Sequence, residues 1–236
     1  MKYQRLKEII RDSKRIVLFT GAGISTPSGI PDFRSANGLY NEKNNYNYSP
    51  EEIISHSFFM AHPKEFYEFY FHKMVYKEAL PNKAHLYFAN LKNLSSVVTQ
   101  NIDNLHTLAN SKKVYELHGS IYHNYCMKCH KFYSLDDLEM NDVPRCSCGG
   151  IIKPDVVLYE EGLDEDVVYG AINEISKCDT LIVVGTSLNV YPAASYLRYF
   201  KGDNLILINK SHTPYDDMAT LCFNEDIIEV INKICE

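Results

Sequence analysis

Four of the seven cysteines in the sequence lie close together, in two pairs with the spacing of a metal site. They are Cys126, Cys129, Cys146 and Cys148. Two residues separate the first pair and one residue separates the second, where two to four are commoner. Thiolates grouped in this way bind Zn²⁺ tetrahedrally, and a site closed by four protein ligands is structural rather than catalytic. We predict a structural zinc on these thiols, with His123 or His130 as the alternative to one of them.

A glycine-rich segment, residues 20–29, directly follows an apolar run and has the composition of a phosphate-binding loop. Its glycines let the backbone approach a phosphate closely, and free amide groups at a following helix start bind an anion. Phe33 and Arg34 follow, and a guanidinium there can bind a phosphate in bidentate fashion. The spacing is not G-x-G-x-x-G, and no strand ends in an acidic residue about 20 positions later, as a dehydrogenase requires. A tight turn without a ligand is the alternative interpretation.

A second group of polar residues follows two further apolar runs. Gln100, Asn101 and Asp103 come directly after one run, with His106 close behind, and His118 comes after the next. Because the carboxyl ends of parallel strands meet at one edge of a sheet, we expect these side chains to converge. A neutral imidazole beside two amides and a carboxylate is a candidate general-base site. A purely structural role for the histidines is the alternative.

Hydroxyl and amide groups follow the last two apolar runs. Gly185, Thr186 and Ser187 come after one of them, and Asn209 ends the other. Such groups at the same sheet edge can contact a phosphate or a ribose hydroxyl. Capped turns without a ligand are the alternative for both segments.

Five short apolar runs, rich in β-branched residues, predict the strands that position these groups. They are residues 16–20, 96–99, 113–116, 180–184 and 204–208. Several of them lack alternation between apolar and polar residues, which is typical of parallel strands covered on both faces. Helical spacing over residues 6–14, 85–92 and 165–176 predicts helices before several of the strands. We therefore predict an α/β fold with a Rossmann-like doubly wound parallel sheet, and ligands outside the carboxyl ends of its strands.

Two stretches interrupt this alternation and predict a smaller lobe. Residues 35–81 hold an asparagine-rich loop and an aromatic segment, 58–76, with helical spacing, and residues 121–151 hold the cysteine pairs. The large, Rossmann-like domain would then consist of residues 1–34, 82–120 and 152–236. The small lobe would combine a helical insertion with a zinc module, and the cleft between lobes is the expected ligand site.

The chain has 236 residues, is 45% hydrophobic and 23% charged, and has a formal net charge of −6. This is the composition of a soluble globular protein. No apolar run approaches the ~18 residues of a membrane span and the first residues lack a signal-peptide core, so we expect a cytoplasmic protein without a membrane partner. The negative charge gives no reason to expect direct nucleic-acid binding. In a reducing compartment, Cys178, Cys222 and Cys235 are expected to be small buried groups or inert thiols.

The motifs, taken in order, resemble those of the sirtuins, the NAD-dependent protein-lysine deacylases. They are Gly-Ala-Gly-Ile-Ser, Pro-Asp-Phe-Arg, Gln-Asn-Ile-Asp, His-Gly, the two cysteine pairs, Gly-Thr-Ser and the late Asn209. The resemblance extends from about residue 10 to the end of the chain, and residues 25–34 are most similar to the bacterial branch. It implies NAD as a consumed cosubstrate, one structural Zn²⁺, acyl-lysine proteins or peptides as substrates, and a monomer.

The resemblance also implies roles for individual residues. His118 resembles the general base, and Asn101 a second catalytic residue. The residues implied to bind NAD are Gly21, Ala22, Gly23, Thr26, Phe33, Arg34, Gln100, Asn101, Ile102, Asp103, Gly185, Thr186, Ser187, Asn209, Asp226 and Ile227. Among them, Phe33 would shield the ribose carbon after nicotinamide leaves, and Asp103 would hold the carboxamide.

In the implied reaction, the acyl-lysine carbonyl oxygen attacks ribose C1′ as nicotinamide departs. His118 deprotonates a ribose hydroxyl, which attacks the resulting imidate, and free lysine and O-acyl-ADP-ribose are formed. No reversible hydride transfer is needed, which accounts for the missing dehydrogenase acid. Protein mono-ADP-ribosyl transfer from the same NAD site is the alternative activity. A module that senses NAD, or that zinc organises for interaction, is the non-enzymatic alternative.

The resemblance implies that the substrate peptide lies as an extended strand between the lobes. The residues expected to contact it are Val156, Val157, Leu158, Tyr159 and Val190. The chain departs from the family at this rim, where the usual Phe-Gly-Glu is Tyr-Glu-Glu at 159–161. An acidic run over residues 160–166 leads to the hypothesis of a preference for acyl-lysines flanked by Lys or Arg, with a solvated helix start as the alternative.

The aromatic segment of the small lobe bears on the choice of acyl group. Some sirtuins that remove succinyl or malonyl groups carry Tyr-x-x-Arg there, and this chain has Tyr70 and Lys73. Lysine supplies the charge but not the bidentate fork of arginine. Acetyl is therefore the expected acyl group, with acidic acyl groups as the alternative.

Overall fold

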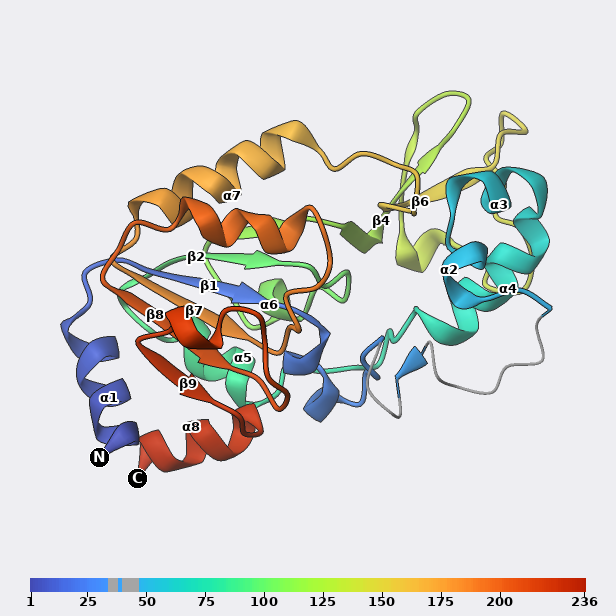
Figure 1. Cartoon of the computed structure of the whole chain (residues 1–236). Helices are drawn as coiled ribbons and strands as arrows, with labels where there is room; N and C mark the ends of the chain where they lie inside the picture. The colour runs from blue at the N-terminus through green and yellow to red at the C-terminus, as the bar shows by residue number, and fades with distance from the viewer. Residues whose placement is uncertain (34–37, 40–46) are drawn as a thin grey trace.

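The computed structural model describes residues 1–33, 38–39 and 47–236 and arranges them around two sheets (Figure 1). Within these residues the larger sheet has six strands in the order β3-β2-β1-β7-β8-β9, and all neighbouring strands are parallel. The strands are β1 (Ile16–Thr20), β2 (Leu94–Thr99), β3 (Val114–Glu116), β7 (Thr180–Val184), β8 (Asn204–Ile208) and β9 (Leu221–Phe223). Counted along the chain, this is the order 3-2-1-4-5-6 of a Rossmann sheet, so the predicted fold class is confirmed.

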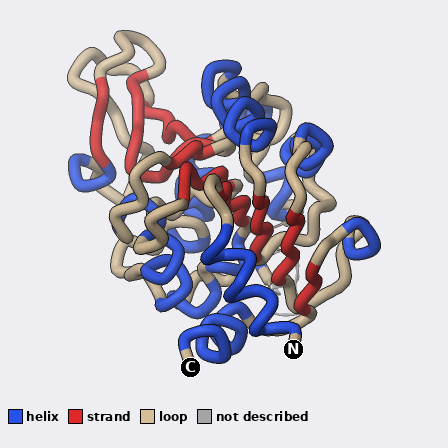
Figure 2. The backbone as a smooth tube through the Cα atoms, turned by 90° about the vertical axis from the view of Figure 1, so that its left-hand side faces the viewer, coloured by secondary structure: helices blue, strands red, loops and turns tan. Residues whose placement is uncertain are grey.

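Apolar side chains alternate between the two faces of this sheet. In β1, Ile16 and Leu18 belong to one buried cluster, and Val17 and Phe19 belong to another. Three helices cover the first face: α1 (Lys2–Asp12), α5 (Lys83–Ala89) and α8 (Ile227–Cys235). The second face is covered by α7 (Glu165–Lys177) and the 3-10 helix η5 (Ala193–Tyr199). Figure 2 shows helices on both sides of the strands, and this burial of both faces explains the uninterrupted apolar runs.

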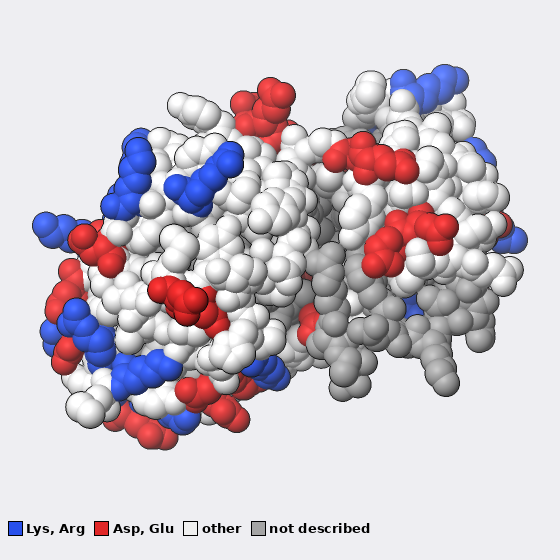
Figure 3. All heavy atoms as spheres, in the orientation of Figure 1, with Lys and Arg blue, Asp and Glu red and all other residues white. Residues whose placement is uncertain are grey.

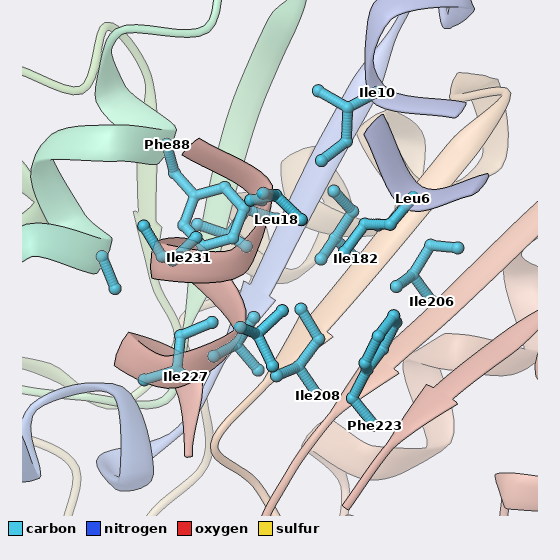
Figure 4. Close-up of a cluster of buried hydrophobic side chains, with 14 of the residues drawn as sticks. Leu6, Ile10, Leu18, Phe88, Ile182, Ile206, Ile208, Phe223, Ile227 and Ile231 are labelled. Carbon is cyan, nitrogen blue, oxygen red and sulfur yellow. The ribbon is translucent and has the colours of Figure 1, made fainter. Parts of the chain in front are cut away.

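The first face is an apolar layer (Figure 4). Leu6 of α1 lies near Ile182 and Ile206 from neighbouring strands, and Ile231 of α8 lies beside Phe88 of α5. Each of these side chains is almost completely removed from water. Full burial of a side chain of this size contributes about 1.5 to 3 kcal/mol, so the layer holds the strands and their carboxyl ends in place.

The smaller sheet is antiparallel, in the order β5-β4-β6. Its strands are β4 (Gly119–Cys126), β5 (Phe132–Ser134) and β6 (Ile152–Val156). Its residues share a buried cluster with three helices: α2 (Pro50–Ile53), α3 (His56–Ala61) and α4 (Pro63–Lys73). The aromatic rings of Phe59, Phe66 and Tyr67 meet edge-on in this cluster, with centroids 4.9 to 6.1 Å apart. This T-shaped geometry is the favoured one for aromatic rings.

Five shorter helices complete the described structure. They are η1 (Ala22–Ile24), η2 (Thr26–Ser28), α6 (Leu105–Leu108), η4 (Leu135–Asp137) and η6 (Asp216–Met218). None of the helices in the described residues combines the length and the apolar character that crossing a bilayer requires.

Several elements differ from the predicted ones. The first helix lies at Lys2–Asp12, and the aromatic segment forms two helices because Pro63 ends one and begins the next. Strand β9 was not predicted, since its residues Leu221–Phe223 include none of the β-branched residues that marked the other runs. The division into two domains remains a prediction. Its boundaries would separate β6 and the first residues of β4 from the small sheet in which they pair.

Candidate active site

A cleft of about 1270 Å³ lies outside the carboxyl ends of the parallel strands. On the face shown in Figure 3, the molecule is hollowed between the part built on the large sheet and the part built on the small one. The predicted site residues that line the cleft are Gly21, Ala22, Gly23, Thr26, Phe33, Gln100, Asn101, Ile102, His118, Val156, Val157, Leu158, Tyr159, Gly185, Thr186, Ser187, Val190, Asn209, Asp226 and Ile227. Arg34 lies outside the described residues.

Two loops cross at the cleft through their glycines. The Gly23 amide donates to the Gly185 carbonyl at 2.8 Å, and the Gly21 amide donates to the Val184 carbonyl at 3.1 Å. A Cβ atom on Gly23 would lie 2.7 Å from Gly185 Cα, which is closer than van der Waals contact allows. Only glycine therefore lets the loop after β1 lie against the loop after β7. The resulting cradle is made of backbone, as close approach to a phosphate requires.

The loop after β1 is also hydrogen-bonded to Asn82, the N-cap residue of α5. The Asn82 side-chain amide donates to the Ile24 carbonyl at 2.8 Å and to Ser28 Oγ at 2.9 Å. Its oxygen accepts from the Ala84 amide at 2.9 Å and so caps the helix. One side chain thus joins the glycine loop to a helix packed on the sheet.

The amide side chains after β2 connect the two loops. Gln100 Nε2 donates to Thr186 Oγ1 at 3.1 Å, and Asn101 Nδ2 donates to Ser25 Oγ at 3.1 Å. Ser25 in turn donates to an Asp103 carboxylate oxygen at 2.6 Å. Burial raises the pKa of the Asp103 carboxyl. Asp103 does not line the cleft and is bound to protein groups, so its predicted contact with a carboxamide remains a prediction.

The geometry of His118 is that of a base with one free ring nitrogen. Its Nδ1 lies 2.8 Å from the Gln100 carbonyl, which can only accept, so Nδ1 carries the hydrogen. Nε2 of the neutral ring is then left as an acceptor. Burial lowers the pKa of His118 below its ordinary value, so the ring is neutral at pH 7. His118 lines the cleft and is therefore placed to take a proton from a ligand there.

His106 does not reach the cleft, contrary to the expectation that it joins the general-base site. It is almost fully buried, and its Nε2 lies 3.0 Å from Thr20 Oγ1. Thr20 also donates to Thr99, and both threonines end strands that lead into the cleft. Burial lowers the pKa of His106 and lowers that of the neighbouring His85 to about 4. The structural interpretation of His106 is therefore the right one.

The four predicted cysteines come together at the end of the small sheet. All four sulfur atoms lie within 4.8 Å of one another, and three pairs are 3.4 to 3.6 Å apart. Tetrahedral Zn–S bonds of about 2.3 Å place sulfur atoms about 3.8 Å apart, so the cluster fits this metal. Within the described residues no histidine joins the cluster, which excludes His123 and His130 from it there. A zinc ion here would be fully enclosed by protein ligands and would act structurally.

Comparison with known proteins identifies the family. A model of the Sir2 family matches residues 21–192, from the glycine loop to the end of the loop after β7. The chain belongs to the Sir2 family. The NAD-dependent protein deacetylase of Clostridium perfringens is 56% identical to this Sir2-family chain over 241 residues, which is 100% of the chain and 99% of the relative.

Two further comparisons agree. The NAD-dependent protein deacetylase of Staphylococcus aureus strain NCTC 8325 is 45% identical over 98% of this chain and 97% of its own length. A solved structure of Sir2 with a p53 peptide and NAD⁺ is 40% identical, with a TM-score of 0.86, and covers 99% of this chain and 97% of its own. The similarity to both proteins therefore spans nearly the whole of the given chain.

In this Sir2-family chain, the segment expected to bind the peptide is partly strand. Strand β6 ends at Val156, and the following Val157 amide donates to the His118 carbonyl at 3.0 Å. Tyr159 forms a single bridge with Ser55 at the start of α3. The segment therefore runs from His118 to the helices of the small sheet and lines the cleft between them.

Three of the five carboxylates in the acidic run are bound within the Sir2-family chain. Glu161 accepts from Lys153 Nζ at 3.1 Å and from the Leu158 amide at 2.9 Å, and Glu160 binds Ser57. Asp164 caps the start of α7. These three carboxylates therefore stabilise the local structure. A preference for acyl-lysines flanked by Lys or Arg remains a hypothesis.

The residues predicted to select the acyl group lie away from the cleft surface. Tyr70 is fully buried in the aromatic cluster, and neither Tyr70 nor Lys73 lines the cleft. The apolar side chains that line the small-sheet end are Phe33, Ile54, Met74 and Ile102. A role of Tyr70 and Lys73 in acyl selectivity stays a prediction.

Sequence reasoning missed several residues that line the cleft. Lys210 and Ser211 follow Asn209 at the end of β8, and the strand-end rule that singled out Asn209 applies equally to them. Ile54 and Met74 carry no comparable signal, because they are apolar residues of helical segments far from any predicted strand end.

Proposed function

We propose that this chain is an NAD-dependent protein-lysine deacetylase that releases free lysine, nicotinamide and O-acetyl-ADP-ribose. The observation that carries the proposal is His118, a neutral imidazole with Nδ1 fixed and Nε2 free, in a cleft shared by the glycine loops and the segment after β6. The names of the relatives, NAD-dependent protein deacetylases at 45 to 56% identity, support the same activity.

We assign the binding of NAD to the loops on the large sheet. The backbone cradle of Gly21 to Gly23 and Gly185 is assigned to the pyrophosphate, with Thr186 and Ser187 beside it. Asn209, at the end of β8, and Asp226 and Ile227, at the start of α8, also line the cleft and are assigned to the adenosine. Asn101 and Asp103 are assigned to the nicotinamide pocket, where the Ser25 hydroxyl holds both.

The chemistry follows from these assignments. NAD supplies the ribose carbon to which the acyl oxygen bonds as nicotinamide leaves. His118 Nε2 would take the proton of a ribose hydroxyl, and that oxygen would then attack the acyl carbon bonded to the lysine nitrogen. Lysine would leave as the free amine, and one water molecule would complete O-acetyl-ADP-ribose. Phe33, which lines the cleft, would keep water from the ribose carbon until the acyl oxygen has bonded to it. Zinc holds the cysteine module together and takes no part in the reaction.

Acetyl is the proposed acyl group. Apolar side chains line the small-sheet part of the cleft. Among the described lining residues, Lys210 is the single lysine or arginine side chain, and it lies next to Asn209, which is assigned to the adenosine. An acidic acyl group would lack a cationic partner in the small-sheet part. The clustered thiols favour a reducing compartment, so we further propose that the enzyme acts in the cytoplasm. We also propose that it acts as a single chain.

The test is mass spectrometry of an acetyl-lysine peptide incubated with the protein, with and without NAD. We expect NAD-dependent loss of the acetyl group and an equal amount of O-acetyl-ADP-ribose. His118→Ala should reduce the rate by a factor of about 10² to 10⁴ at unchanged zinc content, whereas His212→Ala, at an exposed histidine outside the cleft, should not. An unchanged peptide with ADP-ribose appearing on protein would contradict the proposal and favour transferase activity.

A further inference from the structure

Glu160 has a backbone conformation that is unfavourable for its residue type. Its φ is 77°, in the left-handed region where a Cβ atom approaches the backbone too closely. The family pattern quoted above has glycine at this position, and glycine adopts the conformation without steric cost. A glutamate therefore persists here only because other contacts hold it.

The carboxylate of Glu160 makes those contacts with Ser57, the second residue of α3. One oxygen accepts from the Ser57 amide at 2.8 Å, and the other accepts from the Ser57 hydroxyl at 2.9 Å. That amide is one of the first N–H groups of the helix, which have no acceptor within the helix itself. The carboxylate satisfies it and binds the rim of the cleft to α3.

Neighbouring residues strengthen the same junction. The Tyr159 amide donates to the Ile54 carbonyl, and the His56 amide donates to the Tyr159 carbonyl, both at 3.0 Å. Glu161 lies 2.8 Å from His56 Nδ1. Residues 157–161 are thus fastened to the turn between α2 and α3 on one side, while they line the cleft on the other.

We propose that Glu160 is a positioning residue for the acyl-lysine substrate, because its clasp on Ser57 holds residues 157–161 in the conformation that the peptide pairs with. The inference rests on the proposed function. A main-chain partner that is already ordered loses less conformational entropy when a peptide binds to it, so the clasp strengthens peptide binding. It does not touch the NAD loops, and it therefore leaves NAD binding unchanged.

Four variants distinguish the effect of the Glu160–Ser57 hydrogen bonds from the effect of the positive φ at residue 160. Glu160→Gly and Glu160→Asn both tolerate the positive φ, and both lose the reach to Ser57. Glu160→Gln keeps the length and one acceptor oxygen. Ser57→Ala removes only the hydroxyl. Glu165→Gln, at an exposed glutamate in the first turn of α7, is the matched control.

The experiment measures KM for an acetyl-lysine peptide, KM for NAD and kcat, and the Kd of a fluorescent acetyl-lysine peptide by anisotropy. We expect Glu160→Gly and Glu160→Asn to raise the peptide KM and Kd about 3- to 10-fold, the effect of losing a charge-assisted contact. Glu160→Gln should recover part of this loss, and Ser57→Ala should give about a twofold effect. Combining Ser57→Ala with Glu160→Gly should add nothing to the loss in Glu160→Gly.

KM for NAD and kcat should stay within about twofold, and the melting temperature should not fall in Glu160→Gly, since the glycine removes steric strain. An unchanged peptide Kd in Glu160→Gly, or equal rises in both KM values, would overturn the inference. The binding arm needs no turnover. If the wild-type protein binds the peptide without deacetylating it, the proposed function fails while the Kd comparison still decides the role of Glu160, and absence of peptide binding by the wild-type protein overturns both.

Discussion

The six-stranded sheet buries both faces, whereas the three-stranded sheet alternates buried and exposed residues along its strands. In β1 and β7 every residue is buried, but β4 exposes His123 and Tyr125 on either side of the buried Asn124. The large sheet is therefore held by apolar packing on both faces, and hydrogen bonds such as those of Asn82 and Gln100 fix the loops at its edge. The small sheet has less to bury, and the four cysteines at its end supply what packing does not. The proposed base His118 and the glycine loops follow strands of the large sheet, and the cysteine cluster lies at the end of the small one.

Loss of the metal should give the largest difference in stability between the two regions. Cys146→Ala should lose the zinc and unfold the module, because structural zinc contributes about 10 kcal/mol or more to small metal-held folds. Zinc content and proteolysis within residues 126–151 measure the loss. Cys178→Ala, at a buried cysteine of the large region, should keep one zinc per chain. A full complement of zinc in Cys146→Ala would contradict the assignment of Cys146 as a zinc ligand.

Acid should destabilise the large region through its buried histidines. Above pH 6.5 His85 is neutral in both the folded and the unfolded chain, and it adds no pH dependence. Below pH 6.5 the unfolded chain binds a proton that the folded chain does not bind until about pH 4, so the free energy of unfolding falls by about 3 kcal/mol over this range. His106 acts in the same direction.

Urea unfolding followed by circular dichroism at pH 7.5, 6 and 5 measures this slope. His85→Gln removes one titrating group and should give a shallower fall, although its stability at pH 7.5 is lower. His212→Gln, at an exposed position, should keep the slope of the wild-type protein. An equal slope in His85→Gln would mean that acid acts elsewhere in the molecule.

A smaller effect is expected where the two loops of the large region cross. Gly23→Ala should reduce stability by about 1 to 3 kcal/mol, because its Cβ would overlap Gly185, and should raise KM for NAD about tenfold or more. Gly162→Ala is the matched control, since Gly162 also lines the cleft but has open space around it. Thermal unfolding and NAD titration distinguish the two variants, and normal NAD binding in Gly23→Ala would refute the tight crossing.

The smallest effect is expected for the hydrogen bonds that join Asn82 to the glycine loop. Asn82→Asp keeps the oxygen that caps α5 but loses the amide donor to Ile24 and Ser28, so stability should change little. KM for NAD should rise about 2- to 5-fold, the loss of about one hydrogen bond. Asn90→Asp at the other end of α5 should leave KM for NAD unchanged.

The parts that were predicted correctly depend on local patterns. The runs in β1, β7 and β8 are apolar because both faces are buried, and this is visible in the residues themselves. The cysteine spacing likewise indicated a cluster. By contrast, β9 contains no β-branched residue, and the partners of Asn82 lie more than 50 positions earlier in the chain. His106 was misassigned because α6 turns its ring into the core, and the order of residues after a strand does not reveal that turn.

The pairing of β1 also has a consequence for the growing chain on the ribosome. Thr180, the start of β7, is synthesised 160 residues after Thr20, the end of β1, and the two strands lie side by side in the finished sheet. At a synthesis rate of about 5 to 20 residues per second, β7 begins to be synthesised about 8 to 32 s after β1 is finished. During that time β1 can pair only with β2, and its other edge stays exposed to chaperones and to other nascent chains.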